Sequence, residues 1–444
     1  MSDATREVEP VRGMRMFLTV WLSQSISVFG SQLTFFSLTV WLSNRLYPAP
    51  EQKGQLSFAL SAVALAFLLP SVLLAPVAGA WADRHDRRRT LLAADFASAV
   101  LGVAPLLLML TGKLSLPALL LITVLLATFS AFHTAAFESS QASLVPPEQL
   151  GRANGMIQAS YAISSVLAPS VAALLIALPV HSLSGTVDGT PLVIALDCVS
   201  FLVSAVTLLF LRFPQVSPAP AASEQQAGPG LRADIVSGAR FIWERPALLW
   251  LLGLFAVANV VIGPLQVLQP LILKFDLAAD WTARGFRFET ALALLQTCFG
   301  LGAVTGGITI SVWGGLKSRQ IYGVLVPMIL SGVTLVLLGL NRDLYVAAGL
   351  LFLTGTVPPM VNAASLTLWQ QQTPLELQGR VFSVRRVIAL CTAPAGTVIA
   401  GLASAATDPG KVLATLAAGY LVFSVVQLFN PALIRPRQPD VGQA

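Results

Sequence analysis

Three carboxyl groups in this sequence could take part in proton chemistry. Asp95 and Asp197 are each the only charged residue of a long apolar run, and Glu138 directly follows another such run. A carboxyl group in apolar surroundings needs a cation, hydrogen bonds or a bound proton to offset its burial. All three are therefore candidate proton-coupling residues. The alternative is that each is wetted by solvent or paired with a neighbouring helix.

The elements that must position these groups are long apolar runs, of which ten contain no Asp, Glu, Lys or Arg and two contain a single acid. The runs cover residues 16–44, 54–82, 90–112, 114–137, 153–187, 189–211, 246–273, 290–316, 320–341, 344–375, 387–407 and 412–434. About 20 apolar residues cross the hydrocarbon core as a helix, and a charge at the centre costs about 2.5–3.5 kcal/mol. With only 11% charged residues, the sequence predicts an all-α membrane protein with twelve transmembrane helices.

The distribution of basic residues predicts the orientation in the membrane. With the N-terminus in the cytoplasm, cytoplasmic segments hold 19 of the 27 Lys and Arg residues, and the other side holds 8. This positive-inside asymmetry places both termini in the cytoplasm. It accounts for the net charge of +6 and leaves no basic patch for a nucleic acid.

The sequence contains few features that would indicate another class of function. The three cysteines, Cys198, Cys298 and Cys391, fall inside predicted spans and are interpreted as packing residues. Asp95 and Asp197 enter the membrane from opposite faces, which argues against an aspartyl dyad. We therefore expect no enzyme activity, no cofactor and no metal site.

A polar, Pro- and Gly-rich segment divides the chain into two halves. The predicted six-helix bundles are residues 1–213 and 246–444, and residues 214–245 form a cytoplasmic linker. Apolar residues at near-helical spacing within 231–245 predict a short interfacial helix there. The alternative is that this part only extends the linker.

The two halves are related by an internal repeat. The pattern P-x-E-x-x-G-R occurs at 146–152 and again at 374–380, 228 residues later, and ends in Gly151-Arg152 and Gly379-Arg380. The same offset relates Gly79 to Gly307. Repeats of this kind are typical of secondary transporters, whose substrate site lies between them.

One loop carries a distinctive charged pattern, Gly79-Ala-Trp-Ala-Asp83-Arg84-His-Asp-Arg87-Arg88-Arg89. Gly79 and Asp83 are four residues apart and share one helix face. The glycine permits close approach of another helix. The alternative interpretation is a positive-inside anchor without another role.

In these residues the chain resembles the major facilitator superfamily, whose loop pattern G-x-x-x-D-R-x-G-R-R is matched by Gly79, Asp83, Arg84, Arg87 and Arg88. Asp86 stands where the family usually has Gly, at a turn that could require positive φ. The resemblance implies two pseudo-symmetric six-helix bundles. It also implies a cytoplasmic latch that joins Asp83 to Arg385 or Arg386 at the start of the eleventh span.

The segments around Gly151-Arg152 and Gly379-Arg380 resemble the macrolide-efflux and siderophore-exporter branch. In the fifth span, Ala168-Pro169 begins a variant of the antiporter motif G-P-x-x-G-G and is a candidate gating site. The resemblance implies a monomeric, proton-coupled exporter of hydrophobic or amphiphilic small molecules in the cytoplasmic membrane. A lipid or lysolipid flippase of the same fold, and a non-transporting receptor or scaffold, are the alternatives.

In this fold, helices 1, 4, 7 and 10 line the substrate cavity, so polar and aromatic residues on these spans are candidate cavity residues. They are Gln24, Ser27, Ser31, Phe129, Phe132, His133, Asn259 and Gln266. Uncharged amides and aromatic rings suit an amphiphilic, uncharged solute. The alternative is that these groups only make hydrogen bonds between helices.

Overall fold

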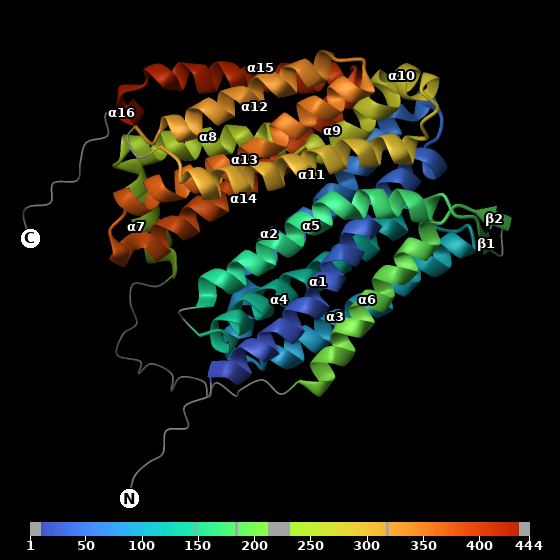
Figure 1. The fold of residues 1–444 in the computed structure, drawn as a ribbon, viewed down its shortest axis with the longest axis horizontal. Helices are drawn as coiled ribbons and strands as arrows, with labels where there is room; N and C mark the ends of the chain where they lie inside the picture. The colour runs from blue at the N-terminus through green and yellow to red at the C-terminus, as the bar shows by residue number, and fades with distance from the viewer. Residues whose placement is uncertain (1–9, 147–148, 183–184, 212–230, 317–318, 435–444) are drawn as a thin grey trace, which may run out of the picture. The chain divides into compact units, whose positions relative to one another are not determined.

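A computed structural model shows the chain as almost entirely helical (Figure 1). It describes residues 10–146, 149–182, 185–211, 231–316 and 319–434. Within these residues, eleven helices are long and apolar enough to cross a membrane. The remaining predicted span corresponds to α14 (Leu375–Ala406), in which the apolar segment Cys391–Ala406 is shorter. The prediction of an all-α, multi-pass membrane protein is confirmed.

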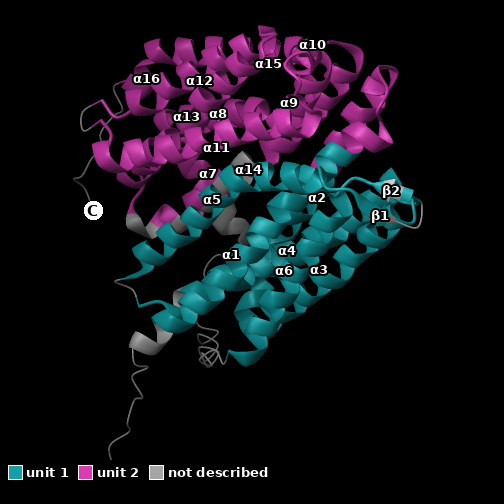
Figure 2. Cartoon of the chain, turned by 45° about the vertical axis from the view of Figure 1, so that its right-hand side comes forward, with its two compact units in different colours: residues 1–41, 66–224 teal, residues 42–65, 225–444 magenta. Residues whose placement is uncertain are grey.

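The chain forms two compact units, coloured separately in Figure 2. Unit 1 comprises residues 1–41 and 66–224, and unit 2 comprises residues 42–65 and 225–444. The segment 42–65, which lies within the first predicted bundle, therefore clusters with the second half of the chain. As a result α2 (Lys53–Arg84) contributes to both units.

Unit 1 is a helical bundle with one small hairpin. Besides the second part of α2, it contains α1 (Pro10–Trp41), α3 (Arg87–Leu110), α4 (Leu116–Leu144), α5 (Leu150–Ile176), β1 (Val180–Ser182), β2 (Gly185–Val187) and α6 (Thr190–Phe210). Helix α3 packs against α4 and α6, and α1 packs against α5 and α6. The contacts α3–α4, α3–α6 and α1–α6 join α1, α3, α4 and α6 into one group of helices.

The sequence explains where several of these helices begin. Asp86 is the N-cap of α3, and its carboxylate accepts a hydrogen bond from the Arg89 amide at 3.1 Å. The φ of Asp86 is −62°, so the expected difficulty with a positive-φ turn at this residue does not arise. Helices α4 and α6 each carry a proline in the first turn, where no intrahelical donor is needed.

Two expected boundaries of the spans in unit 1 were wrong. The charge-free run 153–187 is not one span, because α5 ends at Ile176 and the chain then forms an antiparallel hairpin in which Val180 pairs with Val187. Absence of charge alone does not distinguish a membrane helix from a short uncharged hairpin. Helix α4 extends to Leu144, so Glu138 lies within the helix and not at its end.

Unit 2 contains the remaining elements of the described residues. They are η1 (Leu42–Leu46), η2 (Pro50–Gln52), the first part of α2, α7 (Leu231–Trp243), α8 (Pro246–Ile262), α9 (Leu265–Leu271), η5 (Ile272–Asp276), α10 (Ala278–Ala283), α11 (Phe288–Trp313), α12 (Tyr322–Leu340), α13 (Leu344–Gln372), α14, α15 (Pro409–Val426), η6 (Gln427–Phe429) and α16 (Pro431–Ile434). The seventh predicted span is the continuous series α8, α9 and η5. Both η1 and η5 are single π-helical turns at the ends of spans.

Glycine permits the closest helix packing in unit 2. A Cβ atom added at Gly302 or Gly306 of α11 would collide with a backbone carbonyl of α13, from Phe352 or Thr356 respectively. A Cβ atom at Gly355 of α13 would collide with the Phe299 carbonyl in return. Small residues at such spacing let helix backbones approach each other in a membrane.

The segment predicted as a short helix before the second bundle forms α7. A Cβ atom at Gly238 would lie 2.7 Å from the carbonyl oxygen of Arg380, so α7 packs closely on the start of α14. Phe241 and Ile242 are buried, whereas Trp243 is 75% exposed. The position of α7 at the membrane surface stays a prediction, and residues 214–230 of the linker lie outside the described residues.

Candidate functional site

Asp95 is the centre of a buried polar cluster in unit 1. Its side chain is 1% exposed in the third turn of α3. Its Oδ2 atom accepts hydrogen bonds from Ser204 Oγ of α6 at 2.6 Å and from Gln24 Nε2 of α1 at 3.2 Å. Gln24 Nε2 also donates to Ser204 Oγ at 2.8 Å. The donors around Oδ2 therefore suit an ionised carboxylate, which only accepts hydrogen bonds.

His133 of α4 completes this cluster. Its Nε2 atom lies 2.9 Å from Gln24 Oε1 and 3.2 Å from Asp95 Oδ1. The Gln24 amide nitrogen is already used for Asp95 and Ser204, so its oxygen faces the imidazole and Nε2 must carry the hydrogen. The ring also stacks against Phe137, with a centroid separation of 6.3 Å.

The Oδ1 atom of Asp95 accepts fewer hydrogen bonds than its Oδ2 atom. His133 Nε2 is near Oδ1, but its hydrogen is directed to Gln24, and within the described residues Oδ1 has no hydrogen-bond donor. An unsatisfied oxygen of a buried carboxylate is costly. Because Nε2 already carries a hydrogen, a further proton can bind at Asp95 Oδ1 or at Nδ1, the other nitrogen of the His133 ring.

Gln24, Ser27 and Ser31 form a polar stripe along α1, and this stripe makes contacts between helices of unit 1. Gln24 and Ser27 are each 4% exposed. Ser27 Oγ donates to the Ser200 carbonyl of α6 at 3.1 Å, and Ser31 Oγ donates to Asp197 Oδ1 at 3.4 Å. This arrangement matches the alternative of interhelical hydrogen bonding, and a direct role of the stripe in substrate binding stays a prediction.

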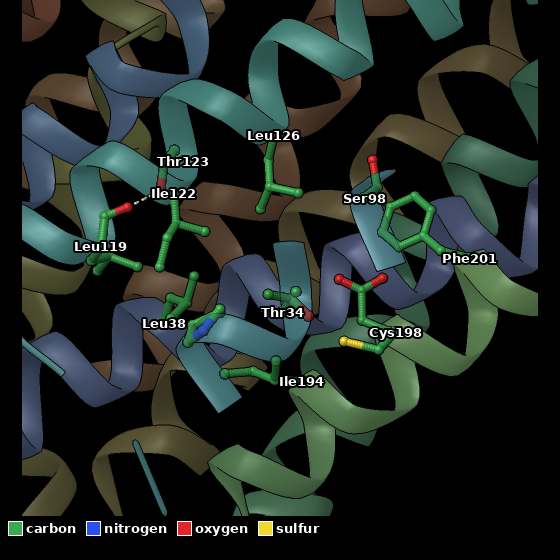
Figure 3. A pocket seen from close by; sticks show the side chains of 13 residues that line it. Thr34, Leu38, Ser98, Leu119, Ile122, Thr123, Leu126, Ile194, Cys198 and Phe201 are labelled. Carbon is green, nitrogen blue, oxygen red and sulfur yellow. Dashed lines mark hydrogen bonds between the residues drawn. The ribbon is translucent and has the colours of Figure 1, made fainter. Parts of the chain in front are cut away.

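Asp197 occupies a second buried position, on α6. Its Oδ1 accepts a further long hydrogen bond, 3.4 Å, from Ser200 Oγ of the same helix. The residue is 8% exposed and lines a small pocket inside unit 1 (Figure 3). Glu138, the third candidate acid, is instead exposed.

Two arginines of the charged loop donate to carbonyls of neighbouring helices, and Arg88 caps one of them. Arg87 Nη1 donates to the Ser139 carbonyl at 2.9 Å, within α4, which continues to Leu144. Arg88 donates from Nε and Nη2 to the carbonyls of Leu208 and Leu209 at the end of α6, at 2.8 and 2.7 Å. Cations at helix C-termini satisfy unpaired carbonyls and interact favourably with the helix dipole. The arginine run thus has a structural role in addition to membrane anchoring.

The other loop residues have different environments. Gly79 has open space around its Cα, and Asp83 and Arg84 are exposed. His85 stacks on Trp81 with 3.7 Å between ring centroids, and Phe132 of α4 meets Trp81 edge to face at 6.0 Å. The latch from Asp83 stays a prediction.

Arg385 lies between aromatic rings of unit 2. Its guanidinium carbon is 5.5 Å from the centroid of Phe255 on α8 and 5.4 Å from that of Trp369 on α13. Such cation–π contacts stabilise a cation in apolar surroundings. The side chain of Arg386 lies outside the described residues, although its backbone belongs to α14.

The remaining candidate residues do not form a single site in the part of the chain that the structure describes. Gly151 and Arg152 are exposed at the start of α5, while Gly379 and Arg380 lie in the first turns of α14. Ala168 and Pro169 are buried inside α5. Among the candidate cavity residues, Phe129 of α4 and Asn259 of α8 are half-buried, and Gln266 of α9 is exposed. Their roles stay predictions.

Ser204 was not identified from the sequence, and His133 and Asp95 were assigned to different sites, the substrate cavity and proton coupling. Ser204 follows Asp197 and Ser200 at intervals of three and four residues, a spacing that puts all three on one face of α6. That spacing could have identified the face. The pairing of His133 with Asp95 depends on how α3 and α4 are rotated about their axes, which no local pattern specifies.

Comparison with known proteins agrees with the architecture. The family model described as Major Facilitator Superfamily matches residues 20–396. Macrolide efflux protein A of Streptococcus pyogenes is 24% identical over 388 residues, which is 87% of this chain and 88% of that protein. Multidrug efflux pump Tap of Mycolicibacterium fortuitum is 26% identical over 386 residues, covering 84% of this chain and 87% of that protein.

Solved structures show the same fold at low sequence identity. A bacterial homologue of iron transporter ferroportin in an inward-facing state has a TM-score of 0.67 and 18% identity, covering 94% of this chain and 98% of that one. The nucleoside transporter NupG has a TM-score of 0.66 and 13% identity, covering 93% and 99%. The resemblance to the macrolide-efflux branch is confirmed by the relatives, and the expected fold is confirmed by the family model and these structures.

Proposed function

Because this chain belongs to the major facilitator superfamily, we propose that it is a proton-coupled exporter of hydrophobic or amphiphilic small molecules. It works by alternating access, as a monomer with both termini in the cytoplasm, in the cytoplasmic membrane. The substrate class rests on the names of its relatives, which are macrolide and multidrug efflux proteins. The uncharged amides and aromatic rings among the candidate cavity residues suit such solutes.

The observation that carries proton coupling is the contact between Asp95 and His133. A carboxylate that is 1% exposed lies 3.2 Å from an imidazole, and both are inside the helical bundle of a membrane protein. A proton on Asp95 would remove the negative charge to which Gln24 and Ser204 donate, and a proton on His133 would place a cation beside that carboxyl group. Binding a proton is therefore expected to change the packing of α1, α4 and α6 around α3.

The test is solute flux in proteoliposomes with an imposed pH gradient, screened first with macrolides. Asp95→Asn keeps the shape of the side chain but cannot accept a proton at Oδ1. We expect Asp95→Asn and His133→Gln to abolish transport driven by the pH gradient while solute exchange in the absence of a gradient continues. Both variants should retain membrane insertion.

Glu244→Gln is the matched control, since it makes the same acid-to-amide change at an exposed residue that pairs with Arg240 outside the cluster. It should transport normally. Full pH-driven transport by Asp95→Asn would refute proton coupling at this pair. Turnover of phospholipid without flux of any tested solute would favour a flippase.

A further inference from the structure

Asp197 is a buried acid whose charge is not offset by a neighbouring cation. It lies inside the membrane-spanning helix α6 and is 8% exposed. No Lys, Arg or His lines its pocket in the described part of the chain, whereas Asp95 has His133 at 3.2 Å. Buried charges in proteins are normally paired or coordinated to a metal ion. Asp197 therefore needs either a bound cation or a bound proton.

The hydroxyl groups around Asp197 are too distant to stabilise its charge well. Ser31 Oγ and Ser200 Oγ each lie 3.4 Å from Oδ1, whereas an O–H···O hydrogen bond is about 2.5–3.0 Å long. The Ser200 hydroxyl has one hydrogen, which it also donates to the Asp197 carbonyl at 2.7 Å. Its lone pairs are therefore free to face a cation.

The same distances suit oxygen atoms that share one metal ion. Oxygen ligands about 2.3–2.6 Å from a cation, the range for Ca²⁺, are about 3.3–3.7 Å apart when they subtend a right angle at it. The ionic radius of Na⁺ is close to that of Ca²⁺. Ser31 Oγ and Ser200 Oγ thus lie from Asp197 Oδ1 at the spacing of neighbouring ligands.

The pocket beside Asp197 offers space and further oxygen atoms (Figure 3). Its volume is about 40 Å³, of which a water molecule would take up about 10–15 Å³. Thr34, Ser98 and Thr123 contribute hydroxyl groups to the lining. Thr34 Oγ1 is buried with no hydrogen-bond partner among the described residues. The pocket therefore has room for a small cation with water molecules that complete its coordination.

The ligand set indicates a monovalent, hard cation. Carboxylate and hydroxyl oxygens suit hard cations, whereas transition metals favour imidazole or thiolate groups. Cys198 also lines the pocket, but its sulfur is a soft ligand. Asp197 is the one acid in this lining as far as the structure describes it. A single positive charge neutralises it, and a divalent ion would leave an excess.

We propose that Asp197 and Ser200 of α6, with Ser31 and Thr34 of α1, form a binding site for Na⁺. The ion takes the place of a salt-bridge partner and joins α1 to α6. Gly30 permits the close approach of these helices, because a Cβ atom there would lie 2.6 Å from Ser200 Oγ. The site goes beyond the proposed function, since it binds a different cation at residues separate from the Asp95–His133 pair.

Binding of radioactive Na⁺ to the purified full-length protein in detergent tests the site, with choline chloride to keep the ionic strength constant. We expect saturable binding and a higher Tm in NaCl than in choline chloride, both lost in Asp197→Asn. Asp188→Asn is the matched control, because it makes the same change outside the pocket and keeps an oxygen that accepts from the Thr190 amide. No saturable binding by the unaltered protein, or normal binding by Asp197→Asn, would overturn the proposal.

A pair of variants at Thr34 tests the site without altering its charge. Thr34→Val removes the hydroxyl but keeps the shape of the side chain, and we expect it to weaken Na⁺ binding about tenfold. Its Tm in choline chloride should not fall, because the hydroxyl has no hydrogen-bond partner among the described residues. Thr34→Ser keeps the oxygen and should bind Na⁺ normally. Unchanged affinity in Thr34→Val would overturn the site as assigned.

Infrared spectroscopy at neutral pH distinguishes Na⁺ from a bound proton. With NaCl present, we expect no carbonyl absorption of a protonated carboxyl group that disappears in Asp197→Asn. Such an absorption would show that Asp197 binds a proton in place of Na⁺ and would overturn the proposal. These measurements involve no transport, so their failure leaves the proposed function intact, and failure of pH-driven transport leaves the Na⁺ site intact.

Discussion

At the scale of single residues, position relative to helix ends decides what a charge does. Arg87, Arg88 and Arg89 are consecutive, yet two of them donate to helix carbonyls while Arg89 is 85% exposed and meets Asp86 at 3.6 Å. Hydrogen bonds made by a charged group contribute about 1.5–3 kcal/mol each, whereas an exposed ion pair contributes little. Identical residue types thus differ in their effect on stability.

We expect Arg88→Ala to lower the stability of the protein by about 1–3 kcal/mol, because the carbonyls of Leu208 and Leu209 lose their donor. Thermal unfolding in detergent measures this as a lower Tm. Arg89→Ala is the control and should change the stability by less than about 0.5 kcal/mol. Equal losses in the two variants would contradict the capping role.

At the scale of helices, small residues set the distance between neighbours in unit 2. Gly306 of α11 faces a carbonyl of α13, while the adjacent Gly307 has open space around its Cα. We expect Gly306→Ala to destabilise the protein by about 1–3 kcal/mol through overpacking. Gly307→Ala should be neutral or slightly stabilising, since alanine favours the helix. Unfolding in detergent distinguishes the two, and a neutral Gly306→Ala would show that α11 and α13 separate easily.

Some of these elements can be predicted from the sequence and others cannot, because only some have a sequence pattern that distinguishes them from a continuing helix. The helices α3 and α6 correspond closely to runs of apolar residues, because the cost of a charge in lipid applies wherever the neighbouring helices lie. The hairpin β1–β2 and the π-helical turn η5 were not predicted, since both lie in or beside uncharged sequence that would also suit a continuing helix.

The candidate site was predicted in part. Asp95 and Asp197 were identified because an isolated acid is conspicuous in apolar sequence. Their partners were not, since hydrogen bonds from Gln24 and His133 depend on the rotation of each helix about its axis, which side-chain packing determines.

At the scale of the whole molecule, the chain crosses between its units inside helices. Residues 42–65 belong to unit 2, whereas the residues on either side of them belong to unit 1. Four side-chain hydrogen bonds hold this segment within unit 2. They are Lys274 Nζ to the carbonyls of Ser43 and Tyr47, Ser57 Oγ to the Gly401 carbonyl and Lys53 Nζ to the Thr407 carbonyl.

Lys274→Met should release one end of this segment, because the half-buried ammonium group is the donor for two carbonyls. Hydrogen–deuterium exchange is expected to become faster in peptides that cover residues 42–52, with little change elsewhere. Lys411→Met is the control, since that lysine is 69% exposed and pairs with Asp408. Unchanged exchange at 42–52 in Lys274→Met would show that the other contacts suffice.

The two crossings that bound residues 42–65 lie at or near interruptions of regular helix. The first, after Trp41, is where α1 passes into the π-helical turn η1, and the second, after Leu65, is followed in α2 by Pro70 and Pro76. Helices bend most easily where their ladder of hydrogen bonds is broken. Residues 42–65 are therefore bounded by positions at which α1 and α2 can bend while the segment keeps its hydrogen bonds within unit 2.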